Sequence, residues 1–276
     1  MLLILVLTSV FAAEYQYGQG TLSFKGGIFG VDKTLSTDIK IYGFLNEHKN
    51  IFGTNYFFAY KLAIYKSQDV KNAIETYNST IGMTSQTSNL SFRYKVKGID
   101  FNFVLGRDFY REGSDYLGVG VLIGITGPYI KSRSDSNNSA SSIPGYEYLN
   151  DSETKMLTYK IGPSLRVQKE LLSFFTVYGD AQYGFQKAHI KNDSAHLDQY
   201  DSGNYTSYNV GIRFQAKSGR KKIWIISFSP KFFVTFGYRY SYWKVKNVKL
   251  NDISLIGPAD ISFTVKYAYF GLGYDF

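Results

Sequence analysis

The chain of 276 residues contains no cysteine and only 5 prolines. Without cysteine it has neither a disulfide framework nor a cysteine-ligated zinc site. It also lacks any run of about 20 apolar residues, the length that a membrane-spanning helix needs, which excludes a bundle of such helices. Aromatic residues make up 18% of the chain, which excludes a disordered protein. Abundant tyrosine and phenylalanine and 26 glycines favour β-strands instead.

The one long apolar stretch lies at the N-terminus, at residues 1–13, and carries no charge. It is too short to cross a bilayer as a helix. Its end is rich in small residues, with Val10 and Ala12 at the −3 and −1 positions of a cleavage site. The sequence therefore predicts a cleaved signal peptide at 1–12 and export of residues 13–276, although a basic segment before the apolar stretch is missing.

Apolar and polar residues alternate along most of the remaining chain. Residues 157–167, for example, put leucine, tyrosine and valine on one face, and Lys160 and Arg166 on the other. This period of two indicates strands, and several are as long as the 9–11 residues (roughly) that a tilted transmembrane strand needs. We predict an all-β protein, an antiparallel up-and-down transmembrane β-barrel of about ten strands. The strands are expected at 20–31, 38–46, 51–66, 91–109, 116–130, 154–168, 174–188, 204–217, 230–246 and 262–276.

Two irregularities leave eight or twelve strands as alternatives. Segment 91–109 changes phase near Gly98, and segment 223–246 is long for a single strand. Aromatic residues gather at strand ends, as in Tyr238, Tyr240, Tyr242 and Trp243, and are typical of an aromatic girdle at lipid headgroups.

Long and short connections alternate in the predicted barrel. The long ones lie at 67–90, 131–153, 189–203 and 247–261, and the short ones at 47–50, 110–115, 169–173 and 218–222. Long outer loops and short periplasmic turns are typical of outer-membrane barrels. Only the first connection, 32–37, breaks this pattern, because it is short where a long loop is expected.

The last residues place Phe270, Leu272, Tyr274 and Phe276 on one face of a strand. Here the sequence resembles bacterial outer-membrane β-barrel proteins, whose last strand ends in an aromatic residue. Gly271, Tyr274 and Phe276 match the assembly signal of that class, and Tyr269 departs from it by standing where a more polar residue is common.

The resemblance implies an outer-membrane location of the Gram-negative type and no nucleic-acid partner. Outer-membrane lipids and lipopolysaccharide would surround the protein, and the barrel-assembly machinery would be its partner during biogenesis. The resemblance does not identify a family within the class.

The formal net charge of +9 falls mainly on the polar face of the strands. Cations outnumber acids there by about six, which predicts a positive lumen. Two interpretations stay open: a narrow porin-like channel favouring small anions, or a barrel plugged by its own side chains. In either case a protein with a structural or surface role is compatible with the sequence. The expected lumen-lining residues are Lys61, Arg93, Lys95, Lys160, Arg166, Asp180, Arg213 and Arg239.

One loop raises the question of catalysis, because it combines His189, Asp193, Ser194, His196 and Asp198. Histidine can act as the base for a nucleophile, and histidine with aspartate can bind a divalent metal. Catalytic triads, however, come together from distant elements rather than from one short loop. We therefore expect no catalytic residue, metal or cofactor, and a protein that is not an enzyme. The alternative is a lipid-modifying enzyme or protease with its site at the extracellular rim.

Overall fold

A computed structural model describes residues 12–28, 31–67, 71–81, 84–134, 152–194, 197–215, 221–223, 226–228, 231–248 and 259–275. Several features discussed above lie outside these residues: the signal peptide up to residue 11, most of the connections 131–153, 218–222 and 247–261, His196, and the terminal Phe276.

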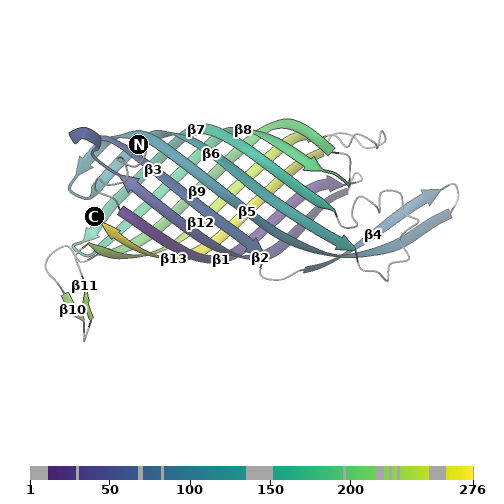
Figure 1. Cartoon of the computed structure of the whole chain (residues 1–276), viewed down its shortest axis with the longest axis horizontal. Helices are drawn as coiled ribbons and strands as arrows, with labels where there is room; N and C mark the ends of the chain where they lie inside the picture. Colours follow the sequence, from purple (N-terminus) through teal and green to yellow (C-terminus); the bar gives the residue numbers. More distant parts are fainter. Residues whose placement is uncertain are drawn as a thin grey trace, which may run out of the picture.

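Ten long strands form a closed antiparallel barrel, which confirms the predicted fold class and the count of ten rather than eight or twelve (Figure 1). Strands that follow one another pair as hairpins, and pairing of the first strand with the last closes the wall. The strands are β1 (Ala12–Ile28), β2 (Val31–His48), β3 (Tyr56–Ser67), β5 (Thr84–Glu112), β6 (Asp115–Ser134), β7 (Glu153–Leu172), β8 (Phe175–Asn192), β9 (Leu197–Gln215), β12 (Phe232–Val248) and β13 (Ala259–Asp275).

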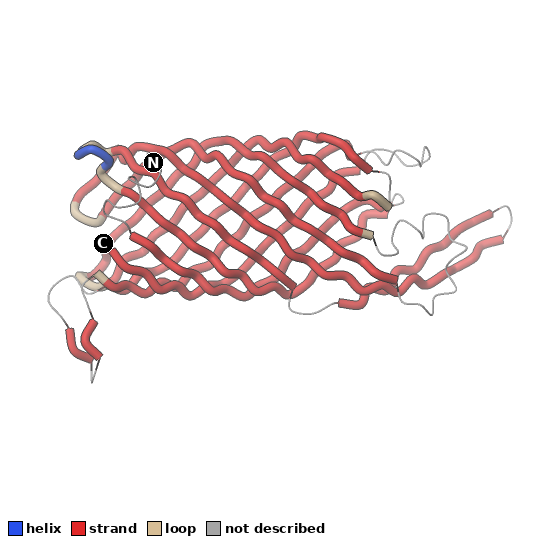
Figure 2. Tube along the Cα trace, viewed as in Figure 1, coloured by secondary structure: helices blue, strands red, loops and turns tan. Residues whose placement is uncertain are grey.

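Both chain ends and a short 3-10 helix, η2 (Ile51–Gly53), lie at one end of the barrel (Figure 1). The other end, here called the outer end, carries β4 (Lys71–Ile81), which pairs with the start of β5 and projects beyond the wall (Figure 2). Much of the predicted loop 67–90 is therefore a hairpin. Two short strands, β10 (Lys221–Ile223) and β11 (Ile226–Phe228), lie within the predicted overlong segment and its preceding turn. No helix in the described residues is long and apolar enough to cross a membrane.

The strands are longer than a bilayer requires. At about 3.3 Å per residue and a tilt of about 45°, a 20-residue strand such as β6 rises about 46 Å, whereas the hydrocarbon core is about 30 Å thick. Part of the wall must therefore stand outside the lipid.

The polarity of the two faces of the wall reverses along the barrel. Nearer the chain ends the outward side chains are apolar, and Leu117 and Ile123 of β6 are 41% and 55% exposed. Nearer the outer end the inward side chains are apolar, and Val96 of β5 is only 1% exposed. We call the outward apolar side chains the apolar belt. One from each strand defines it: Tyr15, Tyr42, Ile64, Ile99, Val121, Ile161, Phe185, Val210, Phe236 and Leu272.

Candidate functional site

Six of the predicted lumen residues lie inside the barrel. Alternation turns their side chains inward from strands whose other face carries the apolar belt. The most deeply buried, Lys160, is 2% exposed, and Arg166 is 7% exposed. The six are Lys61, Lys160, Arg166, Asp180, Arg213 and Arg239.

The structure places Arg93 and Lys95 elsewhere, because both side chains are exposed on the outward face of β5. Strand β5 does not change phase near Gly98. Arg93 and Lys95 share the outward face with Ile99, while Val96 lies inside. What changes along β5 is the environment of its outward face, which is water beside Arg93 and Lys95 and lipid beside Ile99. The sequence prediction assumed that the polar phase of this segment faces the lumen and therefore misplaced these two.

The interior near the middle of the barrel is built around Lys160 of β7. Its ammonium group lies 2.6 Å from Oδ1 of Asp100 on β5 and donates to Oγ1 of Thr126 at 2.8 Å. It also lies 3.9 Å from the centre of the Tyr205 ring, a favourable cation–π distance. Lys160 therefore has a charged, a polar and an aromatic partner from three other strands.

A second cluster surrounds Arg166, nearer the chain ends. Its Nη2 donates to both carboxylate oxygens of Asp108 at 2.8 Å, and its Nη1 pairs with Glu47. The guanidinium lies 3.2 Å from the centre of the Phe57 ring and 4.3 Å from that of Tyr116. This planar group is thus held by two carboxylates at its edge and by aromatic rings at its faces.

A third cluster joins the neighbouring strands β8, β9, β12 and β13 around Asp180 of β8. Oδ2 of Asp180 accepts from Arg239 at 3.2 Å and from the Asn209 amide at 2.8 Å. The Tyr269 hydroxyl donates to Oδ1 of Asn209 at 2.8 Å. The Lys61 ammonium donates to the Tyr267 hydroxyl, also at 2.8 Å. Tyr269, which departs from the polar preference of the terminal strand, thus supplies an interior polar group.

The described interior does not carry the expected surplus of about six cations. The sequence prediction had counted Asp100, Asp180 and Asp275 on the polar face but had left out Glu14, Glu47 and Asp108. Of these three, Glu47 and Asp108 both pair with Arg166. Glu14 lies before the predicted first strand, Glu47 falls in a predicted turn, and Asp108 stands at the end of a predicted strand. Glu14 and Glu47 become interior because β1 and β2 extend farther toward the chain ends than predicted, and Asp108 is interior because alternation along β5 turns it inward. The acids of the interior are Glu14, Glu47, Asp100, Asp108, Asp180 and Asp275.

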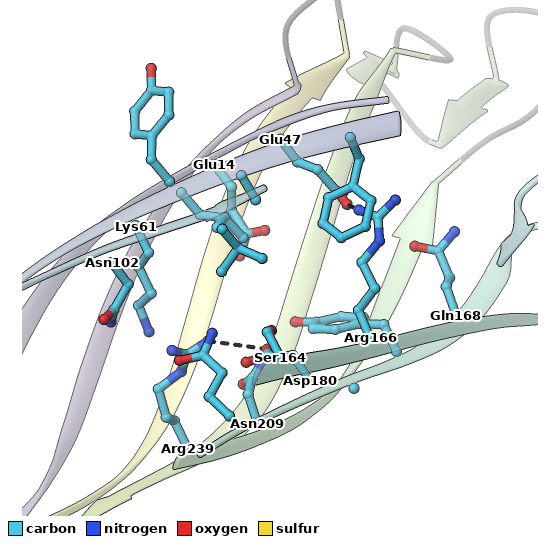
Figure 3. A pocket seen from close by; sticks show the side chains of 18 of the residues that line it. Glu14, Glu47, Lys61, Asn102, Ser164, Arg166, Gln168, Asp180, Asn209 and Arg239 are labelled. Atoms are coloured by element: carbon cyan, nitrogen blue, oxygen red, sulfur yellow. Dashed lines mark hydrogen bonds and ion pairs between the residues drawn. The ribbon is translucent and has the colours of Figure 1, made fainter. Parts of the chain in front are cut away.

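A cavity of about 120 Å³ lies between the Arg166 and Asp180 clusters (Figure 3). Four atoms of its lining residues, Oδ1 of Asn102 and Asp180 and Nε of Arg213 and Arg239, have no hydrogen-bond partner among the described residues. A buried water needs about 10–15 Å³ of such volume and several polar partners, so the cavity is suited to a small group of waters. Waters bound there would hydrate the charged clusters.

Apolar side chains fill the interior between this network and the outer end. Trp243 of β12 is 2% exposed and Tyr205 of β9 is 0% exposed, with ring centroids 5.6 Å apart. The sequence predicted that Trp243 belongs to an outward aromatic girdle. This prediction is wrong, because the Trp243 side chain lies inside the barrel. We call this packing the apolar layer. Its members include Ile39, Tyr65, Val96, Met156, Ile190, Tyr205, Trp243, Val245, Phe263 and Val265.

Most of the predicted loop 189–203 belongs to β8 and β9, and alternation turns His189 and Asp198 to the outer wall of the barrel. Nε2 of His189 lies 2.6 Å from Oδ1 of Asp198, and the His189 ring stacks on Tyr200 at 4.3 Å. His189 and Asp198 lie above the apolar belt, and their hydrogen bond lowers the pKa of the Asp198 carboxyl below its usual value. Ser194 makes no hydrogen bond to His189 within the described residues. Nor does the described part of the chain hold a group of three or more histidine and acidic residues suited to a metal.

Two residues of the terminal assembly motif lie on opposite faces of β13. Tyr274 faces outward, 37% exposed, in line with Phe270 and Leu272. Gly271 faces the interior, where a Cβ atom would collide with the Glu14 carboxylate and the Thr235 hydroxyl. Packing by itself therefore favours glycine at position 271, because Thr235 donates to Oε1 of Glu14 at 2.6 Å at this point.

No family model matches the chain, and no curated protein matches it. Solved structures do. The outer membrane protease OmpT from Escherichia coli has a TM-score of 0.59 and 11% identity, with 97% of each chain covered. A FadL homologue of Pseudomonas aeruginosa has a TM-score of 0.35 and 10% identity, covering 97% of this chain and 91% of that one. Ail of Yersinia pestis has a TM-score of 0.26 and 13% identity, covering 96% and 99%.

The similarity to OmpT overturns the expectation that this chain is not an enzyme. That expectation rested on the composition of a single loop, whereas the same barrel architecture, over nearly the whole of both chains, also occurs in a protease. The low identity restricts the similarity to the fold. The chain therefore has the fold of bacterial outer-membrane β-barrels.

Proposed function

We propose that this protein is an outer-membrane barrel closed to ions and that it acts as a structural or surface-interaction protein through its outer end. The observation that carries the proposal is the apolar layer. A side chain lining a water-filled channel is reached by solvent, yet Tyr205, Trp243 and Val245 are between 0% and 2% exposed. Apolar constrictions of this kind oppose ion passage by excluding water.

The charge pairing of the interior supports the same function. An anion-selective channel needs cations that face water and attract the permeating ion. Here Lys160 and Arg166 are each held by carboxylates within ion-pair distance. Their positive charge is compensated inside the protein, so it is not available to an anion in transit. The narrow porin-like channel is therefore the weaker of the two interpretations that the sequence left open.

Cleavage of the signal peptide at 1–12, insertion by the barrel-assembly machinery and contact with lipopolysaccharide belong to this proposal. The barrel fold and the terminal row that includes Tyr274 support the insertion and the lipid contact, and the apolar stretch at 1–13 with Val10 and Ala12 supports the cleavage. The hairpin of β4 and β5 projects from the outer end and adds surface there (Figure 2).

Electrical recording tests the closed barrel. Purified, heat-modifiable protein in a planar bilayer should give no steady ion current across a range of salt concentrations and both voltage polarities. A pore-forming barrel inserted by the same procedure controls for insertion. Stable unitary currents from the wild-type protein, whether selective for anions or cations, would refute the proposal.

A further inference from the structure

Three lysines form a row on the outward face of adjacent strands. Lys40 of β2 pairs in register with Lys66 of β3, and Lys66 pairs in register with Lys97 of β5. Their inward neighbours Ile39 and Tyr65 are 0% and 3% exposed, so alternation turns all three lysines outward. We call these residues the lysine row.

Like charges directly opposite each other across a sheet destabilise it. Within the described residues none of the three lysines forms an ion pair with an acid. Lys97 instead lies 4.5 Å from the centre of the Tyr129 ring. Along β2 the acid Asp38 comes two residues farther toward the outer end. The row therefore concentrates positive charge at a cost that an external anion would offset.

Immediately beneath the lysine row lies a row of apolar side chains. Tyr42, Ile64 and Ile99 each stand two residues nearer the chain ends on the same three strands, and they pair in register with one another. They are 56%, 50% and 43% exposed and belong to the apolar belt. The lysine row thus stands at the height where the wall leaves the hydrocarbon.

We propose that the lysine row binds the phosphate of a membrane lipid in the outer leaflet. Charge complementarity favours this occupant, because each cation near a membrane surface adds to the attraction for anionic headgroups. The acyl chains of that lipid would lie along Tyr42, Ile64 and Ile99. Lys95, the next outward cation of β5, extends the charge toward the outer end. The inference rests on the outer-membrane location in the proposed function, but it concerns the outer wall and does not depend on whether the barrel conducts ions.

Lipid binding to the full chain in a neutral detergent tests this site. The probes are lipid A, which carries phosphates on a glycolipid, and the same lipid after enzymatic dephosphorylation. Native mass spectrometry counts the lipids bound per protein. Replacement of the lysine row in the variant K40Q/K66Q/K97Q should weaken lipid A binding by about a hundredfold, since each of three cations contributes about a factor of five. Dephosphorylated lipid should bind the wild type and the variant equally weakly.

A matched control separates this site from general charge effects. The variant K155Q/K187Q/K191Q removes the same charge from outward lysines of β7 and β8, two of which lie near Glu153 and Asp193. It should bind lipid A like the wild type. Equal losses in both variants, or equal binding of dephosphorylated lipid, would overturn the proposal. Competition by inorganic phosphate alone, with no dependence on the lipid, would also overturn it.

A folding check completes the experiment. Because the row is repulsive, the lysine-row variant should be at least as resistant to unfolding in neutral detergent as the wild type. Lipid A should stabilise the wild type alone. Stabilisation of the variant by lipid A to the same extent would contradict the site.

Discussion

Asp100→Ala is expected to destabilise the folded barrel by about 3–5 kcal/mol, because it leaves a buried lysine without its carboxylate. Lys160 is 2% exposed, and its remaining partners, the Thr126 hydroxyl and the Tyr205 ring, carry no full negative charge. The measurement is the denaturant midpoint in lipid vesicles, followed by the mobility of unboiled samples on gels.

The double variant Asp100→Ala/Lys160→Met distinguishes the loss of a charge partner from the loss of packing. Methionine removes the ammonium but keeps an unbranched apolar chain in its place. Replacing both members of a buried ion pair is often close to neutral, so the double variant should recover most of the stability. Asp198→Ala, which removes an exposed acid on the outer wall, should leave the midpoint unchanged. A single variant as stable as the wild type would show that Lys160 does not need its carboxylate.

Trp243→Ala is the second variant for which we expect a large effect. The effect should appear both in the stability of the barrel and in its ion conductance. Truncating a buried tryptophan costs about 3–5 kcal/mol, through lost contacts and the space left behind. The same truncation removes the ring next to Tyr205 in the apolar layer. Water from the network around Thr126, which accepts a hydrogen bond from the Trp243 indole at 3.2 Å, can then reach the outer half. Brief unitary currents should appear in planar bilayers.

Two further variants keep this prediction testable. Trp243→Phe retains a ring and should stay silent in the same recordings. Tyr238→Ala truncates an aromatic residue that faces outward on the same strand and is 39% exposed, so it should alter neither current nor the interior. If Trp243→Ala lowers stability without any current, the rest of the apolar layer closes the barrel by itself, and Tyr205→Ala in addition should then open it.

The strands were predictable from the sequence because alternation is a local property. The ten predicted segments each overlap one barrel strand, although β1 starts at Ala12 rather than at residue 20 and the segment 38–46 covers only half of β2. In the first hairpin Ile28 pairs with Val31, so β1 ends and β2 begins earlier in the chain than the expected loop 32–37. These differences concern where strands end, which alternation does not determine.

The composition of the interior was harder to predict. Alternation shows that a strand has one polar and one apolar face, but it does not show which of the two faces the interior. Lys95 and Lys160 both alternate with apolar residues, but only Lys160 points inward. Deciding between them requires the height of each residue relative to the membrane. The partners of Lys160 come from strands far away in sequence, such as Asp100 on β5. Sequence spacing carries no signal for that pairing.

The reversal of polarity along each strand has a consequence for how the strands align during assembly. A one-residue shift turns every side chain to the other face. In β7 such a shift would move Lys160 into lipid, at about 2–4 kcal/mol near the bilayer midplane, and at the same time turn Met156 out into water. One continuous alternation places polar side chains inside near the chain ends and apolar side chains inside near the outer end. An error of alignment is therefore unfavourable at both ends of the strand. The barrel is thus protected against mispaired hairpins twice along the same wall.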